Sequence, residues 1–228
     1  MKHNKSAIAR PPVRPPRPVP LTGRQSHEVR IIGGQWKRTK LAVADKPGLR
    51  PTPDRVRETL FNWLGQDLTG WRCIDAFAGT GALGFEAASR GAKEVLLVEQ
   101  DSALVVQLKR IQTQLQASAT QIVRGDAIAA LKQLDAASMH GVFLDPPFDS
   151  VLFDAALQAA GRAVAADGFV YLEAPILWTD ELLERAGLKV HRYLKAGGVH
   201  AHLLTPAVQC DEPSGRAALH NAAQETTE

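Results

Sequence analysis

The chain has 228 residues, of which 45% are apolar, and this is enough for one well-packed domain with at most a small appendage. No apolar run approaches the ~20 residues of a membrane span, and no apolar segment follows the basic N-terminus as in a secretory signal. Cys73 and Cys210 lie far apart, which argues against a disulfide scaffold or a zinc site, so we expect a cytoplasmic protein without a metal.

Charge is distributed unevenly along the chain, although the net charge is only +3. Residues 1–27 carry +6 and residues 28–72 carry +4, whereas residues 73–228 carry −7. A basic N-terminal part suits a polyanionic partner, and it equally suits a solvated basic tail. Charge alone leaves both interpretations open.

The N-terminal part divides into a tail and a small extension. Residues 1–28 are rich in Pro and Arg and predict a disordered basic tail. Residues 29–49 predict an extension, in which two short strands flank a turn at Gly33-Gly34.

A helix is predicted from about Pro53, with Thr52 as its N-cap and Gly65 after its last turn. Its apolar side chains fall on one face at helical spacing: Val56, Leu60, Phe61 and Leu64.

Strands and helices then alternate. The predicted strands are 71–77, 94–100, 121–126, 141–145 and 168–174, and the predicted helices are 82–91, 102–116, 127–134 and 151–164. After a further helix at 179–187, two strands at 188–197 and 199–206 form a closing hairpin. Short apolar strands separated by helices predict an α/β domain over residues 29–206, with a mostly parallel sheet and an antiparallel C-terminal edge. Residues 207–228 predict a second disordered tail.

Ligands of such sheets bind beyond the carboxyl ends of the strands, so the residues there matter most. The first predicted strand ends in "DAFAGTGALG", where Gly79 and Gly81 allow a tight turn into a helix. Such turns are also common for packing reasons alone. Asp75 at the mouth of the loop would repel a pyrophosphate and would suit an ammonium group.

Acids also follow the next two strands. Glu99 can accept hydrogen bonds from both hydroxyls of a ribose, and Asp126 lies where an adenine amine could reach it. Each acid alone could be a helix N-cap or a turn residue. Together, Asp75, Glu99 and Asp126 predict a pocket for S-adenosylmethionine rather than for NAD.

The fourth strand ends in "DPPF". Proline has no N–H, so the Pro146 carbonyl and the Asp145 carboxylate could present acceptors to a planar amine without competing donors. Phe148 offers a face for stacking an extruded base, an interaction worth ~1–3 kcal/mol. Catalysis would then be positioning, together with stabilisation of the charge that develops on nitrogen. The alternative is a rigid turn with an aromatic plug.

The segments "RIIGGQWKRTKL", "GLRPTPDRVRETLFNWL", "DAFAGTGALGFEAASRGA" and "FLDPPF" closely resemble the RsmD family of 16S ribosomal RNA guanine-N2 methyltransferases, over residues 29–205. The resemblance implies a class I, Rossmann-like methyltransferase fold with a seven-stranded sheet and a small N-terminal hairpin. It also implies S-adenosylmethionine as methyl donor and one guanine of 16S rRNA as target, in the 30S subunit or a late assembly intermediate. We expect a monomer without a membrane or metal partner.

The resemblance also implies roles for individual residues. The base would be held by Asp145, Pro146 and Phe148. The cofactor site would be lined by Asp75, Phe77, Ala78, Gly79, Gly81, Glu99, Gln100, Asp126 and Ala127. RNA would be met by Lys37, Arg38, Lys40, Arg50, Arg55 and Arg57, although Arg55 and Arg57 could instead pair with Asp54 or Glu58.

Two other hypotheses remain open. The same acid-Pro-Pro-aromatic pattern occurs in enzymes that methylate adenine in DNA or a glutamine amide in a protein, often with Asn at the acid position. A non-catalytic RNA-binding or assembly factor could also retain this fold. Other residues predict no site: His200 and His202 are interpreted as strand residues, and Trp36 and Trp63 as packing residues.

Overall fold

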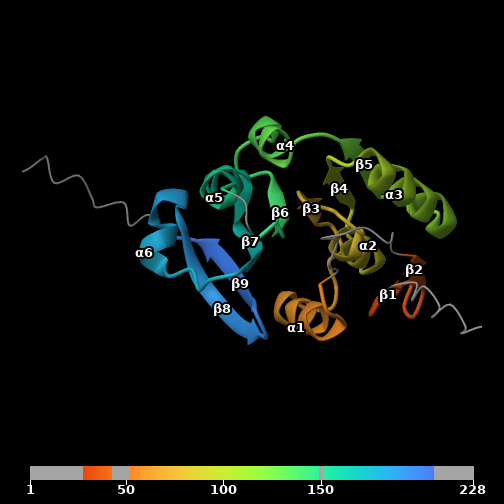
Figure 1. The fold of residues 1–228 in the computed structure, drawn as a ribbon, viewed down its shortest axis with the longest axis horizontal. Helices are drawn as coiled ribbons and strands as arrows, with labels where there is room; N and C mark the ends of the chain where they lie inside the picture. The colour runs from red at the N-terminus through yellow and green to blue at the C-terminus, as the bar shows by residue number, and fades with distance from the viewer. Residues whose placement is uncertain (1–27, 43–51, 149–150, 208–228) are drawn as a thin grey trace, which may run out of the picture.

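The computed structural model describes residues 28–42, 52–148 and 151–207, so the predicted tails lie almost wholly outside the described residues (Figure 1). A seven-stranded sheet has the strand order β5-β4-β3-β6-β7-β9-β8. The strands are β3 Arg72–Asp75, β4 Glu94–Glu99, β5 Thr120–Arg124, β6 Met139–Leu144, β7 Val164–Ala174, β8 Leu188–Ala196 and β9 Val199–Pro206. All pairings are parallel except those of β9, which is antiparallel to β7 and to β8. The predicted class, including the antiparallel C-terminal edge, is confirmed.

The strand order reverses direction next to β3. From β3 the chain builds outward through β4 to β5, and it then returns to pair β6 with the other side of β3. Such a switch point leaves a crevice at the carboxyl ends of the central strands. The ends of β3, β4 and β6 therefore meet at one place, which is where the sequence carries its acids.

Helices cover both faces of the sheet (Figure 1). One face packs against α1 Asp54–Leu64, α2 Ala82–Ser89 and α3 Ser102–Leu115, and the other against α4 Ala127–Gln133, α5 Phe153–Ala163, α6 Asp180–Leu183 and the 3-10 helix η1 Glu184–Ala186. Because strand side chains alternate, Cys73 joins the first core and Ile74 the second. Asp75 therefore faces α1, α2 and α3.

The N-terminal extension, described over residues 28–42, differs from the predicted hairpin. Strands β1 Glu28–Arg30 and β2 Lys40–Ala42 pair as expected, but residues 31–39 form a longer connection that packs on α2. Gln35 N donates to the Ser89 carbonyl at 2.8 Å, and Ser89 Oγ donates to the Gly33 carbonyl at 2.6 Å. A Cβ on Gly34 would lie 1.8 Å from the Ser89 carbonyl oxygen, so the Gly-Gly pair serves close packing rather than a tight turn.

A buried charge network ties the extension and α1 to α2. Glu86 of α2 is fully buried and accepts hydrogen bonds from Ile32 N and Gly33 N, both at 2.7 Å. Its carboxylate also pairs with Arg90 at 2.7 Å and with Arg57 of α1 at 3.5 Å. Three segments that are distant in the sequence thus share one buried carboxylate.

Helix α1 ends before Gly65, as predicted, but Pro53 rather than Thr52 occupies its N-cap. Thr52 is buried, and its carbonyl accepts a hydrogen bond from Arg57 Nε at 3.3 Å. Trp36 and Trp63 pack partly buried against the core, which agrees with their interpretation as packing residues. None of the helices in the described part of the chain is long and apolar enough to cross a membrane.

Candidate active site

The site begins with Asp75 at the end of β3. Its carboxyl is only 2% exposed, and Oδ2 accepts a hydrogen bond from Gly84 N in the first turn of α2 at 2.9 Å. A Cβ on Gly84 would lie 3.1 Å from this oxygen and 2.9 Å from Leu97, so glycine permits the close approach. Burial raises the pKa of Asp75 to about 7, with Glu99 and Glu173 adding to the rise and the Gly84 N–H opposing it. A buried acid of this kind gains from a cationic ligand.

The glycine loop is folded against the end of β4. Glu99 Oε2 accepts a hydrogen bond from Gly79 N, and Oε1 accepts one from Asp101 N, both at 2.8 Å. Ala78 N donates to the Val98 carbonyl at 2.9 Å. Each oxygen of a carboxylate has two lone pairs, so Glu99 keeps one on each for a ligand.

Gly81 caps α2 in the left-handed conformation, with φ of 77°. A Cβ there would lie 2.6 Å from the Leu108 side chain and 2.7 Å from the Phe85 ring, in a backbone region that favours glycine. The loop therefore needs this residue for its own geometry, whatever it binds.

The other residues of the predicted cofactor site differ in exposure and in the face of the sheet that they pack against. Phe77 is partly buried against the core on the far face, Gln100 is exposed and Ala127 is buried. Asp126 is exposed and caps α4, because its Oδ1 accepts a hydrogen bond from Ala129 N at 2.8 Å. Asp126 is therefore a helix N-cap, which was the alternative interpretation of this acid. Its Oδ2 takes no part in the capping hydrogen bond.

The segment "DPPF" follows β6 beside this pocket. Asp145 is half-buried, Pro146 is buried and Phe148 is 39% exposed. Burial raises the pKa of Asp145 well above its ordinary value, and the charges of Glu173 and Asp75 raise it further. Asp145 therefore lies close enough to both carboxyls to interact with them, and the exposed ring of Phe148 is not a core plug.

Two site residues lie on β7 and were not predicted. Tyr171 and Glu173 are 1% and 3% exposed, and Tyr171 Oη donates to Glu173 Oε1 at 2.9 Å. A signal was present, because Glu173 is the last polar residue of the fifth parallel strand, in "YLEA". The rule that selected Asp75 and Glu99 selects Glu173 as well.

The predicted RNA-contacting residues differ in their environment. Lys37, Arg38 and Arg55 are exposed, and Lys40 pairs at the surface with Glu28 at 2.8 Å. Arg50 lies outside the described residues.

Arg57 corrects the prediction. Its guanidinium is fully buried and donates to the Arg30 carbonyl at 2.8 Å and to Asp54 Oδ1 at 2.7 Å, besides pairing with Glu86. A side chain enclosed in this way holds α1 in place and is not presented to RNA.

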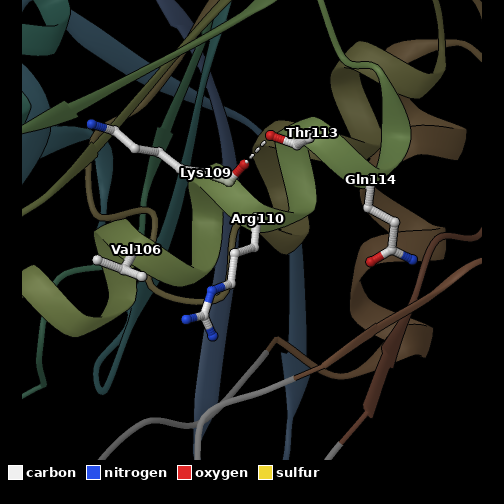
Figure 2. Close-up of a pocket in the computed structure, with 5 residues that line it drawn as sticks. All are labelled: Val106, Lys109, Arg110, Thr113 and Gln114. Atoms are coloured by element: carbon white, nitrogen blue, oxygen red, sulfur yellow. Dashed lines mark hydrogen bonds between the residues drawn. The ribbon is translucent and has the colours of Figure 1, made fainter.

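A shallow depression on the outer face of α3 is separate from the acids (Figure 2). Its lining residues all belong to this helix: Val106, Lys109, Arg110, Thr113 and Gln114. Within the described ranges, no group of three or more His, Cys, Asp or Glu side chains is arranged to hold a metal ion. The concentration of acids at the ends of β3, β6 and β7, with Asp75 and Glu173 buried and Asp145 half-buried, remains the chemically distinctive feature.

Comparison with known proteins agrees with this fold. The family model described as "Conserved hypothetical protein 95" matches residues 29–205. A curated relative from Escherichia coli K12, ribosomal RNA small subunit methyltransferase D, is 43% identical over 154 residues, which cover 66% of this chain and 77% of that protein. A protein of the same name from Haemophilus influenzae is 46% identical over 134 residues, covering 58% and 69%.

A solved Escherichia coli structure, provisionally described as a methyltransferase, is also similar. It has a TM-score of 0.69 and 39% identity, and the match covers 80% of this chain and 100% of that one. The family model spans most of the chain, and the solved neighbour has the same fold. The chain belongs to the RsmD family of methyltransferases.

Proposed function

We propose that this protein transfers a methyl group from S-adenosylmethionine to the N2 amine of a guanine in 16S rRNA, within the 30S subunit or a late assembly intermediate. The observation that carries the proposal is the position of Asp145, which interacts with Asp75 at the carboxyl ends of two adjacent strands. The name of the curated relatives, ribosomal RNA small subunit methyltransferase D, supports the substrate.

The residues present fit S-adenosylmethionine better than a phosphorylated nucleotide. Asp75 and Glu99 offer carboxylate acceptors, and the tight packing of Gly84 holds the Asp75 carboxylate against the first turn of α2. An ammonium group suits Asp75, and two ribose hydroxyls suit the remaining lone pairs of Glu99. A pyrophosphate in the same place would meet two negative charges.

S-adenosylmethionine supplies a methyl group on a positively charged sulfur. The protein's part is to hold the amine in line with that carbon. Asp145 and the Pro146 carbonyl accept the two N–H groups of the guanine amine, which leaves the nitrogen lone pair free to attack. Phe148 stacks on the base, and the Asp145 carboxylate stabilises the positive charge that develops on nitrogen.

RNA would approach along the N-terminal extension. Lys37, Arg38 and Arg55 are exposed, and the extension is fixed to α2 through Glu86 and Ser89. The same helix begins at the glycine loop, so these basic groups are held in a defined relation to the pocket.

Binding of S-adenosylmethionine should depend on pH through Asp75. With a pKa of about 7 in the free protein, Asp75 must lose its proton before it can pair with the ammonium group. Affinity should therefore rise up to tenfold per pH unit between about pH 5.5 and 7, with proton release on binding. Titration calorimetry in buffers of different ionisation enthalpy measures this release.

An Asp75→Asn variant serves as the matched comparison, because the amide oxygen can still accept the Gly84 N–H. It should bind weakly and without the pH dependence. A wild-type affinity that is constant across this pH range would contradict the role of Asp75.

The substrate is tested by tritiated methyl transfer from S-adenosylmethionine. We expect label in 30S subunits taken from a strain that lacks the activity, and much less in subunits that already carry the modification. Label in DNA or in protein would support the adenine or glutamine alternatives instead. Stable rRNA binding without transfer to any of the three would support a non-catalytic assembly factor.

A further inference from the structure

The proposed reaction leaves one buried polar pair of the site without a role. Glu173 and Tyr171 of β7 are almost fully buried, and the tyrosine hydroxyl donates to the glutamate at 2.9 Å. Burial of a carboxyl is costly, so its presence beside the pocket needs a physical reason.

Strand pairing places Glu173 next to Asp145. The register of β6 and β7 pairs Phe143 with Tyr171 and Leu144 with Leu172. Asp145, directly after β6, and Glu173 of β7 come next. Each lies two positions after a side chain that faces α1 and α2, Phe143 and Tyr171 respectively. Neighbouring strands lie about 5 Å apart, which brings the two carboxyls into direct electrostatic contact.

Two carboxyls at this separation do not both ionise readily, so the first proton that the pair takes up is shared between them, and the charge of Glu173 raises the pKa of Asp145. The hydroxyl of Tyr171 is a donor, because burial and the charge of Glu173 raise the tyrosine pKa well above its ordinary value. A donor stabilises the ionised form of Glu173. The shared proton is therefore biased toward Asp145.

Other described groups also lie around the pair. Asp75 of β3 adds negative charge at Asp145, and Glu99 of β4 adds it at Asp75. From β9, Ala201 faces Glu173 and Leu203 faces Tyr171, and both are apolar. The charged groups of the packed helices compensate one another: Arg57 of α1 with Glu86 and Arg90 of α2. Glu173 is thus the carboxyl that lies beside Asp145 across the pairing of β6 and β7.

We propose that Glu173, held by Tyr171, is a positioning residue that makes Asp145 basic enough to take up the proton that the methylated amine must lose. This inference rests on the proposed function. The nitrogen lone pair forms the new N–C bond, the electron pair of the broken C–S bond passes to sulfur, and one N–H proton moves to an Asp145 oxygen. The proton then leaves to solvent before the next turnover. A base whose strength matches the working pH does this best.

The pH dependence of kcat on 30S subunits tests this role. The rate requires ionised Asp145, so the wild-type rate rises with pH along an acidic limb. In Glu173→Gln the neighbouring charge is gone, and the limb should move to lower pH by about one unit or more. The exposed Asp167→Asn, on the same strand, is the matched control and should leave the limb in place. An unmoved limb in Glu173→Gln would overturn the proposal.

Tyr171→Phe provides a second test that keeps the shape of the core. Without the hydroxyl, Glu173 competes for the shared proton, and the limb should again move to lower pH, by a smaller amount. The double variant should shift no further than Glu173→Gln alone, because Tyr171 acts through Glu173. If the double variant shifted the limb by the sum of the two single shifts, Tyr171 would not act through Glu173. If wild-type protein does not methylate rRNA at all, the proposed function fails; an unshifted limb in an active enzyme affects only the role of Glu173.

Discussion

An Asp145→Ala variant is expected to lose about 100- to 1,000-fold in kcat while its affinity for S-adenosylmethionine stays within about threefold of wild type. The physical reason is that we place the guanine amine against Asp145 and the cofactor against Asp75 and Glu99. Asp75 accepts a hydrogen bond from the first turn of α2, and Glu99 accepts one from Gly79 in the glycine loop. Removing Asp145 also removes one negative charge from a crowded group of acids, so the free energy of unfolding should not fall.

Calorimetry gives the affinity, and single-turnover methyl transfer on 30S subunits gives the rate. Asp154→Ala, an exposed acid at the start of α5, is the control and should behave like wild type. Near-wild-type turnover in Asp145→Ala would contradict the assigned role. An equal loss of affinity for S-adenosylmethionine would show that Asp145 contributes to cofactor binding instead.

Glu86→Gln is expected to lower the free energy of unfolding by about 3–5 kcal/mol, the usual cost of breaking a buried ion pair from one side. The change keeps the side-chain shape but leaves the guanidinium groups of Arg57 and Arg90 without their shared buried anion. It also weakens the acceptor for Ile32 N and Gly33 N. Urea denaturation followed by circular dichroism measures the loss.

Glu58→Gln is the matched control, because Glu58 is exposed on α1, and it should change stability by no more than about 0.5 kcal/mol. Hydrogen exchange adds a local readout. In Glu86→Gln the amides of Ile32 and Gly33 should lose protection before the sheet does. A variant as stable as wild type would show that the network is not a main attachment of the N-terminal extension.

The order of strands and helices was predictable, because each strand is a short apolar run bounded by helical periodicity. The strand-end rule also found Asp75, Glu99 and Asp145, and the structure brings Asp75 into electrostatic contact with each of the other two. The sequence alone identifies these residues because parallel strands place their carboxyl ends together, whatever the details of the loops. Their roles in binding remain predictions.

Other features depend on packing partners that are distant in the sequence. Gly33-Gly34 predicts a turn by its composition, and only the position of Ser89 shows that close packing is its purpose. The position of Arg57 in α1 carries a local signal of burial. It lies four residues before Phe61 and seven before Leu64, on the apolar face of α1, where an arginine must be buried or paired.

Glu86 offered a similar signal, as the lone acid of a helix that is otherwise apolar and small. Two opposite charges on two buried helix faces indicate a buried pair, but sequence alone does not say that the faces meet. Glu173 is the last polar residue of the fifth parallel strand, as Asp75 is of the first, whereas nothing local in the sequence shows that Tyr171 donates a hydrogen bond to it.

The most direct measurement of the central claim is the identity of the methylated nucleoside. Labelled 30S subunits are digested to nucleosides after reaction with the wild-type protein, and the products are separated by chromatography with mass detection. The account predicts N2-methylguanosine, formed by the wild type and strongly reduced in Asp145→Ala. Label in a different nucleoside would contradict the assignment of the guanine amine to Asp145 and the Pro146 carbonyl.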